Sequence, residues 1–226
     1  MDQIKEHFNK RSKKFDNEIL KIFPKYNTML TALINAIPNT KNNPKIIDLG
    51  CGTGNITLKI LEKFPNAEIT CLDLSEDMIQ IAKEKLKKYP NITYITADFA
   101  EYLFNKKYDA IISSLALHHI VTSTQKQEMY NKIYEQLTYD GVFYNADIIK
   151  APNNYNQALY KKVSKEEKDP NLSKEKLDEY EKNRTDNDHP ETIFNHIKWL
   201  EKSGFKEIDV IWKYYDSAVY GGIKKE

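Results

Sequence analysis

The chain has 226 residues, of which 40% are hydrophobic, so it can bury one sizeable core and need not divide into several domains. Lys and Arg number 34 and Asp and Glu 33, and the net charge of +1 gives no global reason to expect nucleic acid or an anionic membrane as a partner. No apolar run approaches the length that spans a bilayer, and the charged start, residues 1–8, lacks the apolar core of a signal peptide.

Strand-like and helix-like patterns alternate along most of the chain. Residues 2–36 are predicted to be helical, with Pro24 and Pro38 as breaks. The apolar positions of this segment are Ile4, Phe8, Phe15, Ile19, Leu20, Ile22, Phe23, Met29, Leu30, Leu33 and Ile34. Short apolar runs then predict strands at Lys45–Leu49, Ala67–Leu72, Ile92–Thr96, Tyr108–Ser113 and Val142–Asp147. Helices are predicted at Asn55–Phe64, at Glu76–Lys88 with Ser75 as N-cap, at Gln125–Gln136, and on either side of the fourth strand.

The last third of the chain begins with a long insertion, residues 148–190. Its middle is dense in Lys, Glu and Asp and nearly free of glycine, which favours a helical hairpin or lid over a second core. Asp188 and Glu191 have the spacing of a helix N-cap and its partner acid, and a helix over 191–202 closes at Gly204. The runs 206–214 and 217–223 are separated by only two residues, so they must pair as an antiparallel hairpin.

A glycine-rich loop follows the first predicted strand. Residues 46–55 read Ile-Ile-Asp-Leu-Gly-Cys-Gly-Thr-Gly-Asn and hold three of the seven glycines of the chain. A strand, a glycine turn and a helix N-terminus form a cradle in which the backbone can approach a ligand closely. Asp73 ends the second apolar run, where the acid of a βαβ unit receives the ribose hydroxyls of a nucleoside. The alternative is a tight turn that merely joins a strand to a helix.

Two nucleoside cofactors compete for this pattern. A nicotinamide site requires G-x-G-x-x-G, whereas this loop is G-x-G-x-G and is preceded by Asp48. A carboxylate beside the loop repels a pyrophosphate and suits the ammonium group of S-adenosylmethionine. The run Asp48-Leu49-Gly50-Cys51-Gly52-Thr53-Gly54 resembles the first motif of the class I S-adenosylmethionine-dependent methyltransferases, D-x-G-C-G-T-G. We therefore expect S-adenosyl-L-methionine as the cofactor and not NAD.

The resemblance implies an α/β fold with a Rossmann-like, doubly wound sheet that is mostly parallel and has one antiparallel terminal strand. We expect a single domain, 1–226, with a helical cap at 1–40, a cofactor-binding core at 41–147, a lid or substrate insertion at 148–190 and a C-terminal helix and hairpin at 191–226. A likeness to a set of small bacterial and archaeal methyltransferases covers nearly the full chain. It rests on the cap, the histidine pair at 118–119 and the ending Trp212 to Gly222.

Ligands of such sheets bind at the carboxyl ends of the strands, which ranks the polar residues. The resemblance implies that Asp98 accepts the adenine amino group, that Phe99 and Met78 cover the ring and that Tyr26 reaches over the cofactor. Asp98 could instead be a helix N-cap, Met78 plain core and Tyr26 a surface aromatic. The predicted cofactor contacts are Tyr26, Asp48, Gly50, Cys51, Gly52, Asn55, Asp73, Leu74, Met78, Asp98, Phe99 and Ser114.

A general base is needed only if the methyl acceptor arrives protonated. The segment Ser113 to Ile120 leaves the fourth strand beside the expected methyl group. We assign the pocket position, and the catalytic role, to His118, and packing to His119; the alternative is that both histidines are structural. No metal site is expected, because the adjacent histidines have no third ligand at a recognisable spacing.

Several features bear on the acceptor and the setting. Ser-Ser-Leu-Ala follows the fourth strand, where base-modifying amino-methyltransferases carry Asn- or Asp-Pro-Pro-aromatic, so DNA is disfavoured. We expect a small-molecule acceptor, with an RNA enzyme of the tRNA wobble-uridine type or a non-catalytic binding protein as alternatives.

Segments 1–36 and 148–190 are expected to close over the site, with Tyr26, His118 and His189 nearest the acceptor. Cys51 and Cys71 are expected as free thiols of a cytoplasmic protein, and a homodimer is left open.

Overall fold

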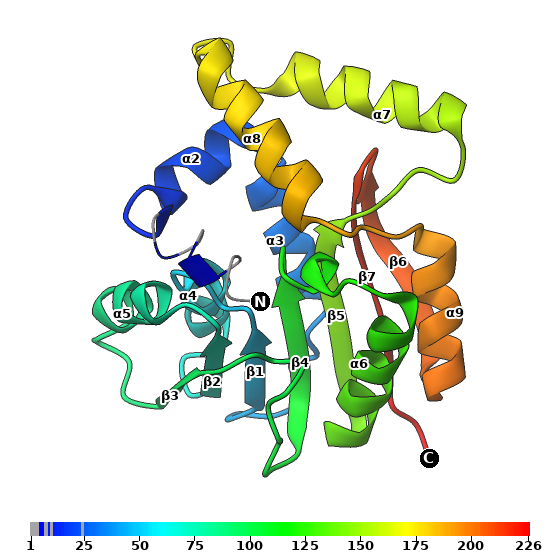
Figure 1. Cartoon of the computed structure of the whole chain (residues 1–226). Helices are drawn as coiled ribbons and strands as arrows, with labels where there is room; N and C mark the ends of the chain where they lie inside the picture. Colours follow the sequence, from blue (N-terminus) through cyan, green and yellow to red (C-terminus); the bar gives the residue numbers. More distant parts are fainter. Residues whose placement is uncertain (1–4, 7–8, 10, 24) are drawn as a thin grey trace.

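The computed structural model describes residues 5, 6, 9, 11–23 and 25–226, so the predicted apolar positions Ile4 and Phe8 and the predicted break Pro24 lie outside the described residues. Within this part, the strands form one seven-stranded sheet in the order β3-β2-β1-β4-β5-β7-β6 (Figure 1). Their bounds are β1 Lys45–Leu49, β2 Glu68–Asp73, β3 Ile92–Thr96, β4 Tyr108–Ser114, β5 Leu137–Ile148, β6 Lys206–Tyr214 and β7 Ser217–Ile223.

The sheet is parallel except at one strand. β1 pairs in parallel with β2 and β4, whereas β7 runs antiparallel to both β5 and β6. The predicted C-terminal hairpin is therefore confirmed, and so is the Rossmann-like α/β fold. The reversed strand comes last among the strands, but it lies second from the edge of the sheet because β6 pairs outside it.

Helices cover both faces of the sheet. The side chains of β1 point alternately to the two faces, so this strand contributes to the core on each side. Ile46 belongs to the core shared with α3 Tyr26–Asn35, α4 Asn55–Lys63 and α5 Glu76–Lys85. Ile47 and Leu49 belong to the opposite core, with α6 Ser123–Gln136 and α9 Ile193–Ser203. The Ser75 hydroxyl accepts the Met78 N–H at 3.1 Å, so the predicted N-cap of α5 is confirmed.

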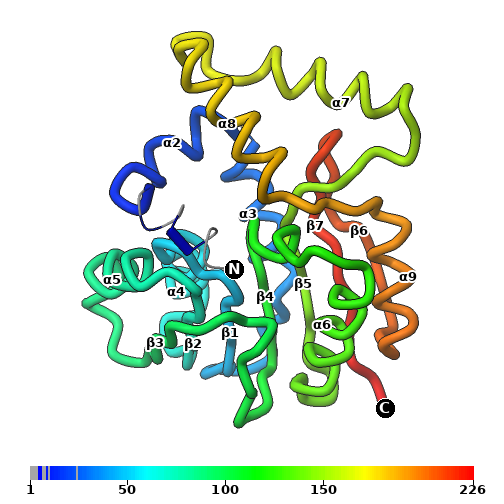
Figure 2. The backbone as a smooth tube through the Cα atoms, viewed as in Figure 1, coloured from blue at the N-terminus to red at the C-terminus, as the bar shows by residue number. Residues whose placement is uncertain are grey.

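The helical hairpin predicted in the insertion is present and lies over the strand ends. Its helices are α7 Asn154–Glu167 and α8 Lys174–Asn187, and α8 lies beside the N-terminal helix α2 Phe15–Ile22 above the carboxyl ends of the strands (Figure 2). The Asp169 N–H, in the turn between α7 and α8, donates to the Lys21 carbonyl at 3.0 Å. In the described part of the chain, every helix is too short or too polar to cross a membrane.

Three local predictions were wrong. No helix precedes β4; the chain makes one turn, in which the Asp98 carbonyl accepts the Tyr102 N–H, and then extends so that Tyr102 packs edge-to-face on Phe104. Strand β5 begins at Leu137, ahead of the predicted turn, because the strand continues through Asp140 despite the positive φ of that residue. Thr192, not Asp188, caps α9, since its side chain accepts the Asn195 N–H at 3.3 Å.

Candidate active site

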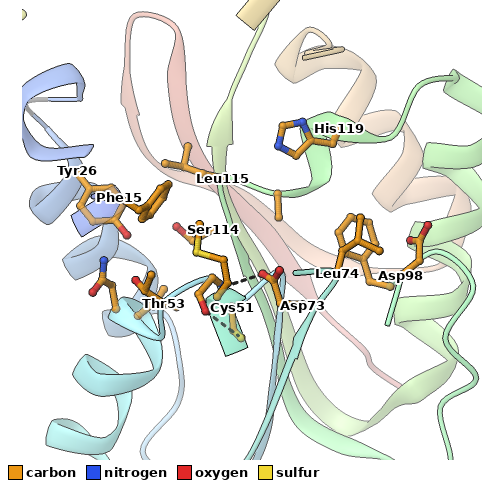
Figure 3. A pocket seen from close by; sticks show the side chains of 17 residues that line it. Phe15, Tyr26, Cys51, Thr53, Asp73, Leu74, Asp98, Ser114, Leu115 and His119 are labelled. Atoms are coloured by element: carbon orange, nitrogen blue, oxygen red, sulfur yellow. Dashed lines mark hydrogen bonds between the residues drawn. The ribbon is translucent and has the colours of Figure 1, made fainter. Parts of the chain in front are cut away.

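A cavity opens at the carboxyl ends of β1, β2 and β4, with about 790 Å³ of empty space that includes its opening to solvent, and we call it the cofactor cavity (Figure 3). Eleven of the twelve predicted cofactor contacts line it, and Asp48 is the exception. Six further residues complete the wall, and none of them was predicted from the sequence as a cofactor contact: Phe15, Thr53, Ile56, Leu115, Ala116 and His119. In Figure 3, Phe15 and Tyr26 lie at one end of the cavity and Asp98 at the other.

The glycine loop is shaped by two different needs. A Cβ added to Gly50 would lie 2.3 Å from the Ala116 Cβ, so Gly50 lets the loop pack closely against the segment after β4. Gly52 has a φ of +53°, and a Cβ added there would meet nothing within 4 Å. The backbone at Gly52 is therefore open to the cavity, as a close approach to a ligand requires.

Asp73 holds the loop in place and keeps acceptor capacity for a ligand. Its Oδ2 accepts the Gly52 N–H and its Oδ1 accepts the Ser75 N–H, both at 2.8 Å. Burial raises the pKa of Asp73, although these backbone hydrogen bonds act in the opposite direction. Each carboxylate oxygen can accept a second bond. Asp73 therefore has the free acceptors that two ribose hydroxyls need.

Asp48 lies behind the loop, out of contact with solvent. Its Oδ2 accepts the Thr57 hydroxyl at 2.7 Å, and its Oδ1 has no hydrogen-bond partner among the residues that the structure describes. Burial raises the pKa of Asp48 to about 7, and the charge of Asp73 adds to the rise. The buried Ser114 hydroxyl, on the cavity wall, also lacks a hydrogen-bond partner within the described part of the chain. Unsatisfied buried polar atoms behind and on the wall fit a polar, cationic ligand such as the methionine end of S-adenosylmethionine.

Replacing Asp48 should make the ligand-free protein more stable at high pH. The folded pKa of about 7 lies above the ordinary 3.8, so the contribution of Asp48 to stability is complete below about pH 4 and is lost as the pH rises through 7. We expect the Asp48→Asn variant to gain stability over the wild type between pH 5 and pH 8, by up to about 4 kcal/mol. Urea unfolding at several pH values measures this difference.

The exposed change Asp77→Asn is the control for loss of one negative charge. Parallel stability curves for the wild type and Asp48→Asn between pH 5 and pH 8 would contradict a desolvated carboxyl at this position. If Asp48 balances the cofactor ammonium, the same variant should bind S-adenosylmethionine more weakly, so stability and affinity should move in opposite directions.

The far end of the cofactor cavity has an apolar wall with one acid. Phe99 and Met78 are buried and line the cavity. The Asp98 Oδ1 accepts the Ala100 N–H at 2.8 Å, so this acid caps a turn and not a helix. Its other carboxylate oxygen can still accept a hydrogen bond. The adenine-binding roles of Asp98, Phe99 and Met78 remain predictions that this arrangement allows.

The N-terminal helices are tied to the glycine loop by a polar cluster. Asp16, on α2, accepts the Thr53 hydroxyl at 2.6 Å, the Asn55 amide at 2.9 Å and the Lys85 ammonium at 2.7 Å. Tyr26 is buried beside it, and burial raises the pKa of its hydroxyl to about 12. The α2 helix thus forms a wall of the cofactor cavity. Cys51 and Cys71 are buried free thiols, as predicted.

A second cavity adjoins the first, with about 770 Å³ of empty space that includes its opening to solvent, and we call it the acceptor cavity. The two cavities share Phe15, Leu115 and His119. Its remaining wall comes from α2, α8 and the segments that follow β4 and β5: Arg11, Ile19, Ile22, Phe23, His118, Ile148, Tyr180, Asn183, Arg184, Asn187 and Asp188. His118 lines this cavity only, His119 lines both, and His189 lines neither. Asp188, which the sequence analysis assigned to a cap, faces the histidines.

His118 sits between two carboxylates. Its Nδ1 lies 2.5 Å from Asp147 Oδ1, and its Nε2 lies 3.4 Å from Asp188 Oδ1. Burial alone would lower the pKa of His118, but the charges and hydrogen bonds of Asp147 and Asp188 raise it to about 9. Burial and the neighbouring His118 charge lower the pKa of His119 to about 3. The catalytic role of His118 remains a prediction.

The chain resembles methyltransferases in sequence and in structure. A family model for the methyltransferase domain matches residues 46–141. Malonyl-[acyl-carrier protein] O-methyltransferase 1 of Ilyobacter polytropus is 33% identical over 62% of this chain and 49% of its own length, so the chain spans about half of that enzyme. An uncharacterized methyltransferase of Alkaliphilus oremlandii is 30% identical, with 67% of each chain covered.

Two comparisons cover nearly the whole length of both chains. Carboxy-S-adenosyl-L-methionine synthase of Nautilia profundicola is 28% identical over 96% of this chain and 98% of its own. The crystal structure of the N-methyltransferase NodS from Bradyrhizobium japonicum, solved with S-adenosyl-L-homocysteine, superposes with a TM-score of 0.70 at 14% identity and 98% coverage of each chain. This last likeness shows the fold.

Proposed function

We propose that this chain, which belongs to the class I S-adenosylmethionine-dependent methyltransferases, transfers the cofactor methyl group to a small molecule bound in the acceptor cavity. The observation that carries the proposal is the adjacency of two cavities. The cofactor cavity is lined by the family's cofactor motifs, and the acceptor cavity is covered by α2 and α8. A concave site with apolar walls and a few polar side chains suits a small-molecule ligand.

The protein's contribution to methyl transfer is mostly positional. S-Adenosylmethionine carries a methyl group on a sulfonium that is already activated, and the acceptor must approach in line with the breaking bond. The shared residues Phe15, Leu115 and His119 mark where the two ligands would meet. Orienting two reactants can supply an effective molarity of roughly 10⁵–10⁸ M. The roof of α2 and α8 would also exclude water, which supports the proposed role of 148–190 as a lid.

Production of a carboxylated cofactor is the second candidate function. It is favoured by the full-length match to carboxy-S-adenosyl-L-methionine synthase, since the O-methyltransferase relative is matched over only about half its length. A reaction of that class brings a carboxyl group against the cofactor methyl. Arg11 and Arg184 line the acceptor cavity and could face such an anion, although Arg11 is already paired with Glu18 at 2.8 Å and Arg184 with Asp216 at 3.0 Å.

Methyl incorporation from labelled S-adenosylmethionine into a metabolite extract tests the proposal. Label in a small molecule, together with S-adenosylhomocysteine, is the expected result. Label in RNA would overturn the small-molecule proposal in favour of an RNA-modifying enzyme. A cofactor product that is heavier by a carboxyl group would favour the synthase, and no turnover with any fraction would favour a binding protein.

Filling the acceptor cavity should stop transfer without stopping cofactor binding. Ile19 lines the acceptor cavity but not the cofactor cavity, so an indole in its place would occupy the acceptor's space. We expect the Ile19→Trp variant to keep the wild-type affinity for S-adenosylhomocysteine and to lose at least roughly tenfold in kcat/KM, a loss of about 1.4 kcal/mol in transition-state stabilisation.

The matched control is Leu20→Trp, the same change one residue along α2 at a side chain that is 49% exposed. This control should transfer methyl groups at the wild-type rate. Equal activity of the two variants would mean that the acceptor does not bind in this cavity, and it would favour a binding site on an open face of the protein.

A further inference from the structure

We propose that His118, His119 and Asp188 bind a divalent first-row cation of the zinc class, which holds a hydroxyl or thiol group of the acceptor beside the cofactor methyl group. This inference rests on the proposed function for the identity of the acceptor group, but the cation site itself can be tested without any methyl acceptor. Two imidazoles and one carboxylate are a donor set that such cations take in proteins, with further positions left for a substrate.

The spacing of the donor atoms suits a tetrahedral cation. Asp188 Oδ1 lies 3.4 Å from His118 Nε2 and 3.5 Å from His119 Nδ1, and the candidate donor atoms all lie within 4.8 Å of one another. Zinc–nitrogen and zinc–oxygen bonds of about 2.0–2.2 Å place the corners of a tetrahedron roughly 3.4 Å apart. The two contacts of Asp188 therefore already have the length of a tetrahedral edge.

The surroundings of His118 resemble those of a metal-ligating histidine. Its Nδ1 faces the Asp147 carboxylate at 2.5 Å, which directs Nε2 toward Asp188. Asp147 is itself fixed, because it accepts the His118 N–H at 3.0 Å, the Asn145 amide at 3.2 Å and the Ile148 N–H at 2.9 Å. A carboxylate behind a ligating histidine sets the ring orientation and the tautomer and strengthens the donor nitrogen. An ion pair on the surface would need no such backing.

The site also has an open side. His118, His119 and Asp188 all line the acceptor cavity, and His119 lines the cofactor cavity as well. A fourth position on the cation would therefore face the space where the acceptor meets the methyl group. The Asn187 carbonyl lies 3.1 Å from His119 Nδ1 and accepts its proton, so Nδ1 would have to lose that proton, with the ring taking its other tautomer, before it could coordinate the cation.

The chemistry follows from Lewis acidity. A hydroxyl or thiol that coordinates to the cation gives up its proton to water more easily than it does when free. Its oxygen or sulfur then forms a bond to the methyl carbon while the carbon–sulfur bond of the sulfonium breaks. The bonding electron pair stays on the sulfur of S-adenosylhomocysteine, so the charges balance. Binding of the cation requires the donor nitrogens of the two histidines to be free of protons, so any proton that they carry is released.

Titration of the full chain with Zn²⁺ alone, after removal of metal with a chelator, tests the site. We expect one equivalent to bind saturably, and Co²⁺ to give the absorption spectrum of a low-coordinate nitrogen–oxygen site. The Asp147→Asn variant should bind Zn²⁺ roughly 10–100-fold more weakly. Asp188→Asn, which removes a ligand, should lose more affinity than that.

The matched control is His189→Gln, which removes a neighbouring histidine that lines neither cavity. It should bind Zn²⁺ as the wild type does. No saturable binding by the unmodified chain, or equal affinity of the wild type and Asp188→Asn, would overturn the proposal. If a variant fails to fold by circular dichroism, the Co²⁺ spectrum of the unmodified chain decides.

These outcomes are separate from those of the proposed function. Zinc binding that depends on Asp188, together with no methylated small molecule, would leave the cation site standing and remove the proposed function. Methylation at an unchanged rate after chelation, with no bound zinc, would do the reverse.

Discussion

The Gly52→Val variant should lose measurable affinity for S-adenosylmethionine and S-adenosylhomocysteine. Gly52 has a φ of +53°, which side chains other than glycine rarely adopt, and the position of an added Cβ is open space on the cavity side. A branched side chain would occupy the volume that the cofactor needs and would strain the loop that presents the Gly52 N–H to Asp73. Isothermal titration calorimetry with S-adenosylhomocysteine measures the loss.

The control for a destabilising change at another positive-φ glycine is Gly204→Ala, where the added Cβ would also lie 3.0 Å from the Tyr134 ring. Gly204 also has a positive φ, +102°, but it ends α9 outside both cavities. This variant should be less stable and yet bind the cofactor normally once folded. If Gly52→Val still binds S-adenosylhomocysteine, or if the wild type binds NAD and not S-adenosylhomocysteine, then S-adenosylmethionine does not bind at this loop.

The Asp73→Ala variant should bind the cofactor one to two orders of magnitude more weakly. One or two hydrogen bonds from ribose hydroxyls to a charged group, at about 1.5–3 kcal/mol each, set this scale. The sequence predicts that the fold is unaffected, but the Asp73 carboxylate also accepts the N–H groups of Gly52 and Ser75. We therefore expect a fall in Tm as well, because two backbone donors lose their acceptor.

Affinity and stability can be separated at this position. Asp73→Asn keeps the size of the side chain and one acceptor oxygen, so it should unfold at a higher temperature than Asp73→Ala. It should still bind more weakly than the wild type, because a neutral amide is a poorer acceptor for hydroxyl groups. An unchanged dissociation constant in both variants would place Asp73 outside the ribose site.

The cofactor cavity could be predicted from sequence because its determinants are local. The glycine spacing, Asp48 and Asp73 all lie at the ends of strands whose apolar runs are easily recognised, and parallel strands bring their carboxyl ends to one edge. The hairpin at 206–223 was equally accessible, since a two-residue connection allows only one kind of pairing.

The acceptor cavity was harder, because long-range packing builds it. Asp188 reaches His118 only through the path of the whole helical hairpin, and its local context, an acid ahead of Pro190, suggested a helix cap instead. Phe15 is one of many apolar residues on an amphipathic helix, and nothing in its neighbours shows that it separates two cavities. His189 was expected near the acceptor but is not among the residues that line the acceptor cavity, and its backbone N–H donates to the His118 carbonyl at 2.9 Å.

The position of β7 has a consequence for how the chain is made. Residues 217–223 leave the ribosome after every other strand, yet they lie between β5 and β6. Until they emerge, β5 presents an unpaired edge of backbone N–H and carbonyl groups along Val142 to Ile148, and β6 has no neighbour to hold it. Such an edge can pair with another nascent chain. Any partly folded state that holds β5 in the sheet before β7 has paired is therefore open to association along this edge, and the pairing of β7 closes it.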